Sequence, residues 1–455
     1  MTGGALLLIL VGCEGQDPFI SNVEAVVSEY MPTVVMVSWE LAEEAEAWVE
    51  YAPAPNCDWT TRTRTGTSGT VALMGIPSVT DVCYRVVAEL GDSRYISEEG
   101  EIRTGNIPST APAVTVEVLD EERIQPGYLL GAYVVVPSAI FVLDRWGNYV
   151  WYQELPFHYT AAQLQLHRNG QGFLYNQFPD KSTQLESDRV SIRHVGFDGR
   201  EVSALLTEGG HHAFQQIDDG GYVYIGIDKR DVEGLGLTVG DRIVEVDAEG
   251  VTTEIWSAWD HPDEIPFDYN EDLEVGFYVD SADWTHSNYV YADKNRGSYT
   301  ISMRNLDTVL EVDAVTGEHL RSVGTYGTHA FTDGTIPVKA PHSARWTEDD
   351  TLLMFSSPTS TEYEGHRSYG LEISIDDVTE EAFREETYGM AEENHAQILG
   401  ETYHLENGNT FVSFGSSGEM IEITPEGEVV WRLTLEAGNF PGHSEMITSF
   451  APEFE

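Results

Sequence analysis

The sequence is poor in basic residues and has only three cysteines in 455 residues. Its 24 Lys and Arg residues stand against 77 Asp and Glu residues, which gives a formal net charge of −53. So negative a surface repels the phosphates of nucleic acid, and no nucleic-acid partner is expected. The Asp-x-Asp-x-Asp-Gly spacing of a calcium loop is absent as well. We therefore expect the acidic residues to form a solvated coat that keeps the protein soluble.

The N-terminal apolar run, residues 3–12, is too short to cross a bilayer and ends at Cys13. The stretch Leu10-Val-Gly-Cys13 resembles the lipobox of bacterial lipoproteins, in which the cysteine is lipidated after cleavage. This resemblance implies that residues 1–13 are a lipoprotein-type signal segment. It also implies a lipid-anchored protein of the cell envelope, on the periplasmic side of the outer membrane or at the cell surface.

Length and composition favour more than one structural unit. Hydrophobic residues make up 41% of the chain, so it can bury a large core, and 455 residues are too many for one simple core. Residues 18–105 alternate apolar and polar residues in short runs, which is typical of a β-sandwich. The strand around Trp39 and residues 73–88 resemble the fibronectin type III pattern. Such a domain is usually a spacer or a dimerisation module, so a homodimer is one assembly to expect.

The remaining cysteines lie inside this expected sandwich. In the oxidising compartment of a lipoprotein, Cys57 and Cys83 are expected to form a disulfide, with two separate buried thiols as the alternative. Residues 106–115 follow, and their prolines favour an extended, semi-rigid linker. Nothing in either segment indicates catalytic chemistry.

Residues 116–455 carry a loose repeat of about 45 to 70 residues, each unit built of four short strands and Asn/Asp-Gly turns. Five copies lie near residues 161–205, 211–257, 284–323, 342–386 and 399–434. A half copy at residues 141–151 can be completed by the segment that begins at His443. Four-stranded units at this period predict a β-propeller. The expected fold is therefore all-β: a six-bladed β-propeller preceded by a small fibronectin type III-like sandwich.

Three of the predicted blades begin with a histidine in the same phase. His212, His286 and His342 are each followed seven residues later by an aspartate, namely Asp219, Asp293 and Asp349. A residue just before the innermost strand of a blade points into the mouth of the central channel, so the three imidazoles are expected to converge. His211 is an alternative to His212, because a one-residue bulge would exchange the two.

An arginine is expected near this histidine cluster. Arg304 follows His286 by eighteen residues, the length of one strand, a turn and a returning strand, so it belongs to the same blade. Its planar guanidinium suits an oxyanion, although a salt bridge to one of the many acids is the alternative interpretation. Three imidazoles and a guanidinium would make a local positive site for a small anion in a very negative protein.

The segment Asp283-Trp-Thr-His286-Ser-Asn288, followed by Ser302-Met-Arg304-Asn305, resembles the signature of bacterial arylsulfate sulfotransferases. The similarity extends over roughly residues 130 to 450. It implies a six-bladed propeller with an N-terminal β-sandwich. It also implies transfer of a sulfuryl group from an aryl sulfate donor to a phenolic acceptor by a ping-pong mechanism, with no cofactor and no nucleotide sulfate donor.

The same resemblance implies roles for individual residues. His342 would be the nucleophile that becomes sulfohistidine, while His286, Arg304 and His212 or His211 would bind and polarise the group in transfer. Asn288, Asn305 and Trp284 would contact the substrate, although tryptophans of propeller strands more often pack between blades. His342 is followed by Ser343 and Ala344, where the family more often has an acidic residue, and the His211-His212 pair lacks one too. A catalytic histidine needs a group that orients it.

Two other functions fit parts of the pattern. Three histidines around an open position are the ligands of a catalytic zinc, but Arg304 close by would repel a cation, so no metal is expected. A non-catalytic, lipid-anchored ligand-binding or adhesion propeller would keep the fold and lose the chemistry.

Overall fold

The computed structural model describes residues 19–59, 61–62, 69–135, 137–180, 189–217, 220–265, 267, 278, 281–335, 337–358 and 367–450. Within these ranges the regular structure is β-strand, with a few single-turn 3-10 helices. No helix in this part of the chain is long and apolar enough to cross a bilayer. Cys13 and Asp219 lie outside the described residues.

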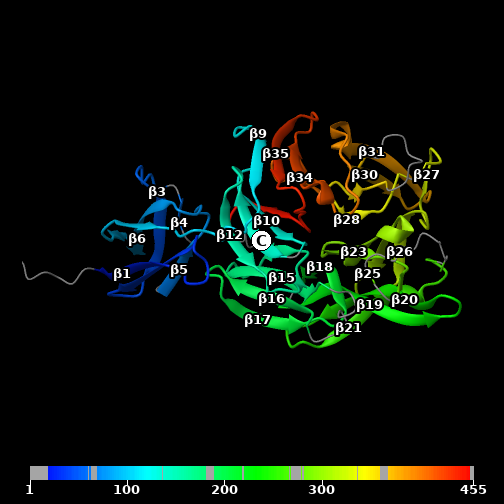
Figure 1. Cartoon of the computed structure of the whole chain (residues 1–455), viewed down its shortest axis with the longest axis horizontal. Helices are drawn as coiled ribbons and strands as arrows, with labels where there is room; N and C mark the ends of the chain where they lie inside the picture. Colours follow the sequence, from blue (N-terminus) through cyan, green and yellow to red (C-terminus); the bar gives the residue numbers. More distant parts are fainter. Residues whose placement is uncertain are drawn as a thin grey trace, which may run out of the picture.

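The N-terminal unit is a sandwich of two β-sheets (Figure 1). In β2 the side chains of Val35, Val37 and Trp39 are buried and those between them are more exposed, because alternate residues of a strand face opposite sides. One sheet contains β1 (Ile20–Val27), β2 (Val35–Leu41) and β5 (Gly69–Leu73). The other contains β3 (Glu46–Pro53), β4 (Thr61–Arg62), β6 (Asp81–Leu90), β7 (Ser93–Ile96) and β8 (Gly100–Arg103).

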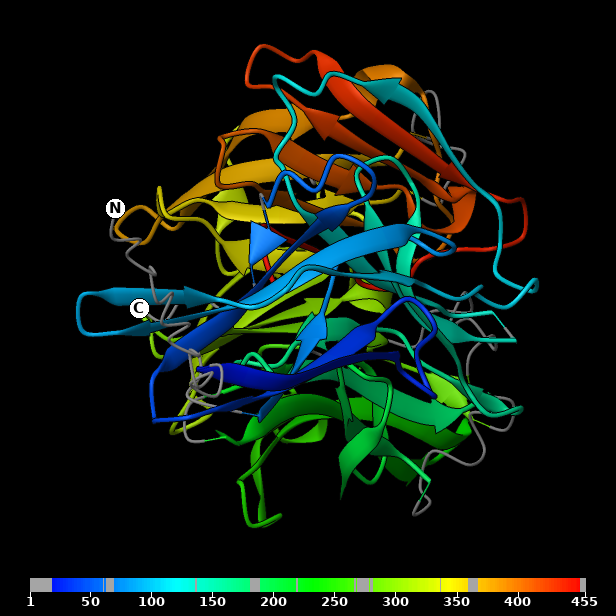
Figure 2. The same cartoon turned by 90° about the vertical axis from the view of Figure 1, so that its left-hand side faces the viewer.

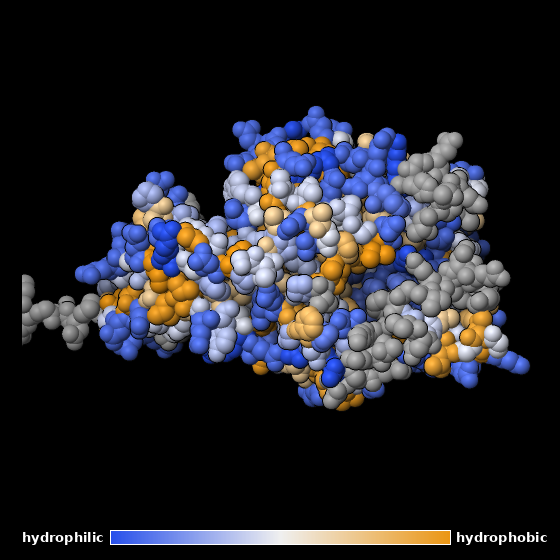
Figure 3. Space-filling model, in the orientation of Figure 1, coloured by the Kyte–Doolittle hydropathy of each residue, from blue (hydrophilic) through white to orange (hydrophobic). Residues whose placement is uncertain are grey.

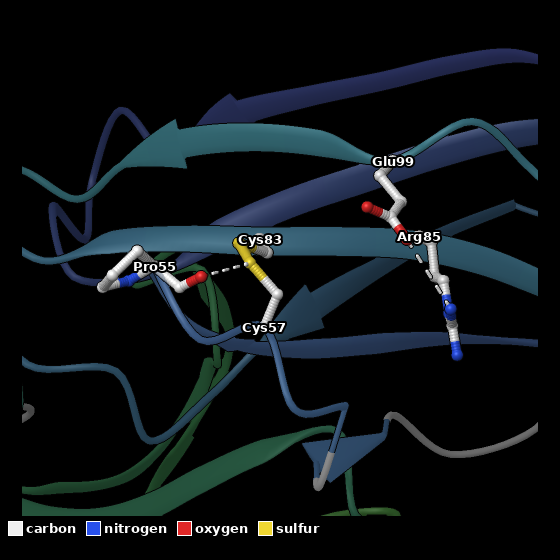
Figure 4. The surroundings of a disulfide bond; sticks show 5 residues. All are labelled: Pro55, Cys57, Cys83, Arg85 and Glu99. Atoms are coloured by element: carbon white, nitrogen blue, oxygen red, sulfur yellow. Dashed lines mark hydrogen bonds and ion pairs between the residues drawn. A yellow bond between two sulfur atoms is a disulfide. The ribbon is translucent and has the colours of Figure 1, made fainter.

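A disulfide joins Cys57, in the loop after β3, to Cys83 on β6. The two Cα atoms are 5.6 Å apart, and Figure 4 shows the bond beside the ion pair of Arg85 and Glu99. The bond closes a loop of the sandwich and lies within one sheet, since β3 and β6 are hydrogen-bonded neighbours.

The described part of residues 114–450 forms six further sheets, which Figure 1 shows arranged around a common axis in a propeller-like ring. From the axis outwards, the first sheet contains β36 (Glu445–Ile447), β10 (Tyr128–Tyr133), β11 (Ala139–Asp144) and β12 (Tyr149–Glu154). The second contains β14 (Leu164–Leu166), β15 (Gly172–Pro179), β16 (Ser191–Gly196) and β17 (Glu201–Leu206), and β13 (Tyr159–Thr160) also pairs with β15. The third contains β18 (Gly210–Gln216), β19 (Tyr222–Val232), β20 (Gly236–Val246) and β21 (Thr252–Ser257), and β22 (Ala282–Asp283) also pairs with β20. The fourth sheet contains β23 (Ser287–Asp293), β24 (Ser298–Met303), β25 (Thr308–Asp313) and β26 (His319–Gly324). The fifth contains β28 (His342–Trp346), β29 (Leu352–Ser356), β30 (Tyr369–Asp376), β31 (Glu381–Tyr388) and β27 (Ala330–Phe331). The sixth contains β32 (Glu401–His404), β33 (Thr410–Ser413), β34 (Glu419–Ile423), β35 (Val429–Leu435) and β9 (Val114–Leu119).

Burial follows the distance of a strand from the axis. Every residue of β11 and of β24 is buried, because each sheet packs against a neighbouring sheet on both faces. The outer strand β17 is exposed along most of its length. Inner strands of successive sheets contact one another around the axis, as β18 contacts β23 and β23 contacts β28. These inner strands line the channel in which the candidate site lies.

The ring is closed by strands from both ends of this region. The C-terminal β36 pairs with β10, and β9, which begins at Val114 within the segment expected to be a linker, pairs with the outer strand β35. A buried ion pair between Arg145 and Glu422 joins the first and last sheets, and the Arg145 guanidinium lies 4.0 Å above the ring of Trp431. Glu422 also accepts hydrogen bonds from Asn409 Nδ2 and from the backbone N–H of Gln125, so its charge is well compensated.

The sandwich packs against the first two sheets of the ring, and Figure 2 shows it in front of them. Met31, Val34 and Met74 of the sandwich share a hydrophobic cluster with Trp151 of β12. The Ser28 hydroxyl donates to the backbone carbonyl of Asp198 at 2.6 Å. On the face drawn in Figure 3, hydrophilic residues cover much of the surface of both units, as the acidic composition requires.

Candidate active site

Three inner strands begin with a β-bulge at the same end of the channel. A bulge adds a residue to one strand, turns the chain and redirects the side chains beside it. Residues with positive φ stand at these places, which is uncommon for side chains other than glycine. The register shifts lie between His211 and Phe214 in β18, between Ser287 and Tyr289 in β23, and between His342 and Arg345 in β28. The positive φ values are 54° at His212, 44° at His286 and 53° at Ser343.

The bulges decide which histidines are equivalent. His211, His286 and His342 each stand three residues before the first residue that pairs again after the bulge. His212 is one position later, inside the longest bulge, and its ring also enters the cluster. The ring centroids of His212 and His211 are 4.9 Å apart, and those of His212 and His286 are 5.1 Å apart.

A buried carboxylate holds the His211-His212 pair. His211 Nε2–H donates to Asp241 Oδ1 at 3.2 Å, and both side chains are fully buried. The other oxygen of Asp241 accepts the Thr285 hydroxyl at 2.6 Å and the backbone N–H of Ser287 at 2.5 Å. Burial by itself would raise the pKa of Asp241, but these hydrogen bonds outweigh it and lower the pKa below the usual value. The two ring nitrogens Nδ1 of His211 and Nδ1 of His212 approach to 2.6 Å.

A second carboxylate orients His286. Its Nδ1–H donates to Asp283 Oδ2 at 2.5 Å, and the Asp283 side chain is almost completely buried. The two residues are three positions apart, and the turn between β22 and β23 brings them together. A ring held through Nδ1–H has its lone pair on Nε2, on the opposite edge of the ring.

His342 is oriented by a backbone carbonyl. Its Nδ1–H donates to the carbonyl oxygen of Ala340 at 2.8 Å, and the residue is 3% exposed. Ala340 itself is fixed, because its backbone N–H donates to Asp307 Oδ1 at 2.7 Å. The other oxygen of Asp307 accepts Lys339 Nζ at 2.9 Å. The neutral tautomer that this geometry selects carries its lone pair on Nε2.

The Arg304 guanidinium lies in the same sheet as His286. It stands in a 3-10 turn, η4 (Arg304–Leu306), directly after β24, and its backbone N–H donates to the carbonyl of His286 at 3.1 Å. Arg304 Nη1 donates to Asn305 Oδ1 at 2.9 Å, and Asn305 Nδ2 donates to the backbone carbonyl of Asp283, also at 2.9 Å. Asn305 therefore connects the arginine to the segment that carries the His286 partner.

Asn288 and His443 connect neighbouring sheets behind the histidines. Asn288 Nδ2 donates to the carbonyl of Pro341, the residue before His342, at 3.0 Å. His443 Nε2–H donates to the backbone carbonyl of Asn288 at 3.1 Å. Burial lowers the pKa of His443 to about 4, so this imidazole is neutral at physiological pH. Asn288 thus holds the loop that carries His342.

The cluster disfavours positive charge on its own imidazoles. Burial lowers the pKa of His342 well below the usual value, and the charge of Arg304 lowers it further. Burial also lowers the pKa of His212, with additional repulsion from His211 and His286. Both rings are therefore neutral near pH 7, the state in which an imidazole can act as a nucleophile or a base.

Part of the chain that carries this cluster is similar in sequence to a known protein family. Residues 127–325 match the family model described as Arylsulfotransferase (ASST). Over this segment the chain is similar to arylsulfotransferases. The matched range contains His211, His212, His286 and Arg304, whereas His342 lies beyond its end. No curated protein matches the chain.

Solved structures similar to this chain have low identity to it. A protein of unknown function from Bacteroides caccae is 14% identical, with 70% of this chain and 98% of that chain covered and a TM-score of 0.43. The periplasmic gluconolactonase PpgL of Pseudomonas aeruginosa is 10% identical, with 70% and 99% covered and a TM-score of 0.39. A putative 6-phosphogluconolactonase of Bacteroides fragilis is 9% identical, with 90% and 99% covered and a TM-score of 0.36.

The three residues predicted to contact the substrate, Asn288, Asn305 and Trp284, have different surroundings in the structure. Asn288 and Asn305 hold the loops of His342 and Arg304, as described above. Trp284 is 1% exposed, and its ring packs against Trp259 at 4.7 Å and Phe267 at 5.1 Å. This environment is that of a core residue and not of a wall against which a phenol could stack.

Sequence reasoning missed the groups behind the rings. Asp241 was not singled out, Asp283 received no role of its own, and His443 was considered only as part of ring closure. Asp241 is thirty residues from His211 in the chain, and only the pairing of β18, β19 and β20 brings the two together. Among the described residues, no group of three or more His, Cys, Asp or Glu side chains is arranged to hold a metal ion.

Proposed function

We propose that this protein is an aryl-sulfate sulfotransferase that moves a sulfuryl group from an aryl sulfate to a phenol through a sulfohistidine at His342. The observation that carries the proposal is the hydrogen bond from His342 Nδ1–H to Ala340, which directs the Nε2 lone pair away from the backbone. Arg304 lies close enough to lower the pKa of His342 and so keeps the nucleophile neutral. Similarity of residues 127–325 to the arylsulfotransferase family supports the class of reaction.

In the first half-reaction, His342 Nε2 attacks the sulfur of the aryl sulfate. The N–S bond forms, the S–O bond to the aryl group breaks, and a phenolate leaves. Transfer of this kind has a loose transition state that needs positioning and charge stabilisation more than covalent assistance. Arg304 supplies a permanent charge for the sulfuryl oxygens, and His286, fixed by Asp283, supplies a second polar group.

In the second half-reaction, the oxygen of an acceptor phenol attacks the same sulfur. The O–S bond forms, the N–S bond breaks, and His342 returns to its neutral state. The phenol must lose its proton as it attacks, so a base is required beside the nucleophile. His212 is the neighbouring imidazole that belongs to a different sheet from both His286 and His342.

Turnover and trapping test this function. Purified protein is incubated with 4-nitrophenyl sulfate and phenol, and release of 4-nitrophenol together with formation of phenyl sulfate is the expected result. With the donor alone, the peptide that contains His342 should gain the mass of one sulfuryl group. Absence of both products with a series of aryl sulfates would refute the enzyme and leave a ligand-binding propeller. Because Asp241 and Asp283 orient the rings, the missing neighbouring acids no longer favour that alternative.

We also propose that Cys13 is lipidated, that the sandwich is of the fibronectin type III class and that the six sheets are propeller blades. The lipobox-like stretch before Cys13 supports the anchor, and the division of the sandwich into three and five strands supports its class. Metabolic labelling with an alkyne fatty acid should label the wild-type protein and leave Cys13→Ser unlabelled. Equal labelling of both would refute the anchor.

A further inference from the structure

The contact between the two neighbouring imidazoles constrains their protons. His211 Nδ1 and His212 Nδ1 are 2.6 Å apart. Two lone pairs would repel at this distance, and two N–H groups would collide, so one proton must lie between the nitrogens. A chain of hydrogen bonds therefore runs from Asp241 through His211 to His212.

The carboxylate at the end of the chain fixes the direction of the first bond. Asp241 Oδ1 can only accept, since hydrogen bonds lower the pKa of this residue and keep it ionised. His211 Nε2 must therefore carry a hydrogen. If His211 is neutral, its Nδ1 has the lone pair, and the shared proton belongs to His212 Nδ1. The neutral His212 ring then has its lone pair on Nε2.

We propose that Asp241, His211 and His212 form a two-imidazole proton relay that removes the proton of the acceptor phenol, with His212 as the ring that contacts the substrate. This assignment rests on the proposed function, because it describes the base of the second half-reaction. His211 and Asp241 do not touch the substrate and act through His212.

The proton balance of the relay is simple. As the phenol oxygen attacks the sulfohistidine, its proton moves to His212 Nε2. The proton on His212 Nδ1 moves to His211 Nδ1 in the same event, so the hydrogen bond between the rings is kept with its direction reversed. His212 stays neutral, and the positive charge resides on His211, whose Nε2–H already points to the Asp241 carboxylate. The transfer of the sulfuryl group from His342 to the phenolate completes the step.

The surroundings explain why two rings serve better than one. Burial and four neighbouring imidazoles, those of His211, His286, His342 and His443, disfavour a positive charge on His212. Both effects lower the pKa of His212. His211 instead has Asp241 on its far side and the uncharged Tyr278 ring at 6.4 Å. Passing the proton to His211 places the charge next to a carboxylate.

The relay predicts different effects on the two half-reactions. The donor step with 4-nitrophenyl sulfate needs no proton, because the 4-nitrophenolate that leaves is a weak base. In Asp241→Asn and His211→Gln, the rate of 4-nitrophenol release in a single turnover should stay within about threefold of wild type. Transfer from the sulfohistidine to phenol should fall by roughly 10²- to 10³-fold, the usual contribution of a general base. The loss should shrink to less than about tenfold with an acceptor phenol that is already ionised at neutral pH.

A matched control separates the relay from the support of the fold. Thr285→Val removes a hydrogen bond to the other oxygen of Asp241 and one from the Asp241 backbone N–H, but it leaves every atom of the proton path and the Asp241 charge in place, so a loss caused by weaker support of the fold should affect both half-reactions equally. The pH profile of the acceptor step gives a second readout. Loss of the Asp241 charge lowers the pKa of the relay, so the acidic limb of that profile should move to lower pH in Asp241→Asn.

Each outcome has one meaning. Equal loss of both steps in Asp241→Asn and His211→Gln, or a loss independent of the acidity of the acceptor, would overturn the relay while leaving the sulfotransferase assignment intact. A wild-type protein that transfers no sulfuryl group would overturn both, because the relay is defined by that reaction. Selective loss of transfer to weakly acidic phenols, with normal sulfohistidine formation, would support it.

Discussion

Two buried polar clusters lie along the same channel, and they differ in where their negative charges stand. The mouth cluster consists of His211, His212, His286, Arg304 and His342. The lower cluster consists of Tyr289, Arg345, Glu401, Ser444 and Glu445, and it borders a cavity of about 260 Å³. Arg345 follows His342 by three residues on β28, beyond the bulge.

The lower cluster is neutralised by an ion pair. Arg345 Nη2 donates to Glu401 Oε1 at 2.7 Å and to the Tyr289 hydroxyl at 2.9 Å. The other oxygen of Glu401 accepts the backbone N–H of Ser444 at 2.6 Å. The guanidinium also lies 4.8 Å from the ring of Tyr403. Such a network holds the inner strands together and occupies the charges that an anion would otherwise use.

In the mouth cluster the carboxylates bind the imidazoles from behind. Asp241 and Asp283 each hold a ring through one nitrogen, and Arg304 donates to the neutral carboxamide of Asn305. Asp241 and Asp283 thus set the tautomers of His211 and His286. The comparison teaches that a buried acid can pair with a guanidinium, as Glu401 does, or orient an imidazole, as Asp241 and Asp283 do.

Removal of the nucleophile should have the largest effect and would confirm the mouth as the reacting end. His342→Ala should lower turnover of 4-nitrophenyl sulfate by roughly 10⁴-fold or more, because no covalent intermediate can form. The sulfuryl mass on the peptide around residue 342 should disappear with it. Near-normal thermal melting would show that the loss is chemical, and a variant that kept its rate would assign the nucleophile to another residue.

Replacement of the cation at the mouth should have the next largest effect. Arg304→Lys keeps the charge but loses the planar fork, so we expect kcat/KM to fall by roughly 10²-fold, with a further loss in Arg304→Gln. Both half-reactions should be affected, because the sulfuryl oxygens are present in each. A change confined to the acceptor step would contradict this role.

The repeat pattern predicted one histidine in phase on each of three strands but could not resolve which residue of the His211-His212 pair is equivalent to the others. Turn spacing placed His212, His286 and His342 in phase, whereas the bulges make His211 the equivalent of the other two. The length of a bulge depends on how a strand meets its neighbours, which spacing along one chain does not report. Both rings nevertheless enter the cluster, because they are adjacent in the longest bulge.

The partners of these rings were harder to foresee than the rings. Asp241 contacts His211 only because three consecutive strands fold back on each other, and the sequence has 77 acidic residues from which to choose. Trp284 was expected beside the substrate, but Trp259 and Phe267 bury it. The turn spacing does not distinguish His342 from His212 and His286. Its role as the nucleophile was therefore predicted from the family resemblance alone.

Disruption of the lower cluster should reduce stability and spare the chemistry. Glu401→Gln leaves the buried Arg345 without its counter-ion, which typically costs about 3–5 kcal/mol of unfolding free energy. Replacing both residues with methionine should recover most of this loss, because no unpaired charge then remains. Urea unfolding measures the first effect, and kcat of the folded fraction should stay within about threefold. A larger loss of kcat would mean that the two clusters are functionally coupled.

The pH dependence of stability should reveal the imidazole between the two clusters, with the smallest effect. The pKa of His443 falls from 6.5 to about 4 on folding, so the unfolded chain binds the proton more readily between these values. The contribution of this pKa difference to the free energy of unfolding is therefore complete above pH 6.5 and is lost as the pH falls toward 4. The loss is at most about 3 kcal/mol. Glu445 has the opposite sign, since burial raises its pKa to about 7 and its contribution is lost as the pH rises through that value. The difference in melting temperature between wild type and His443→Gln isolates the histidine, and it should shrink as the pH falls from 6.5 to 4. A difference that stays constant over this range would show that His443 is not buried in its neutral form.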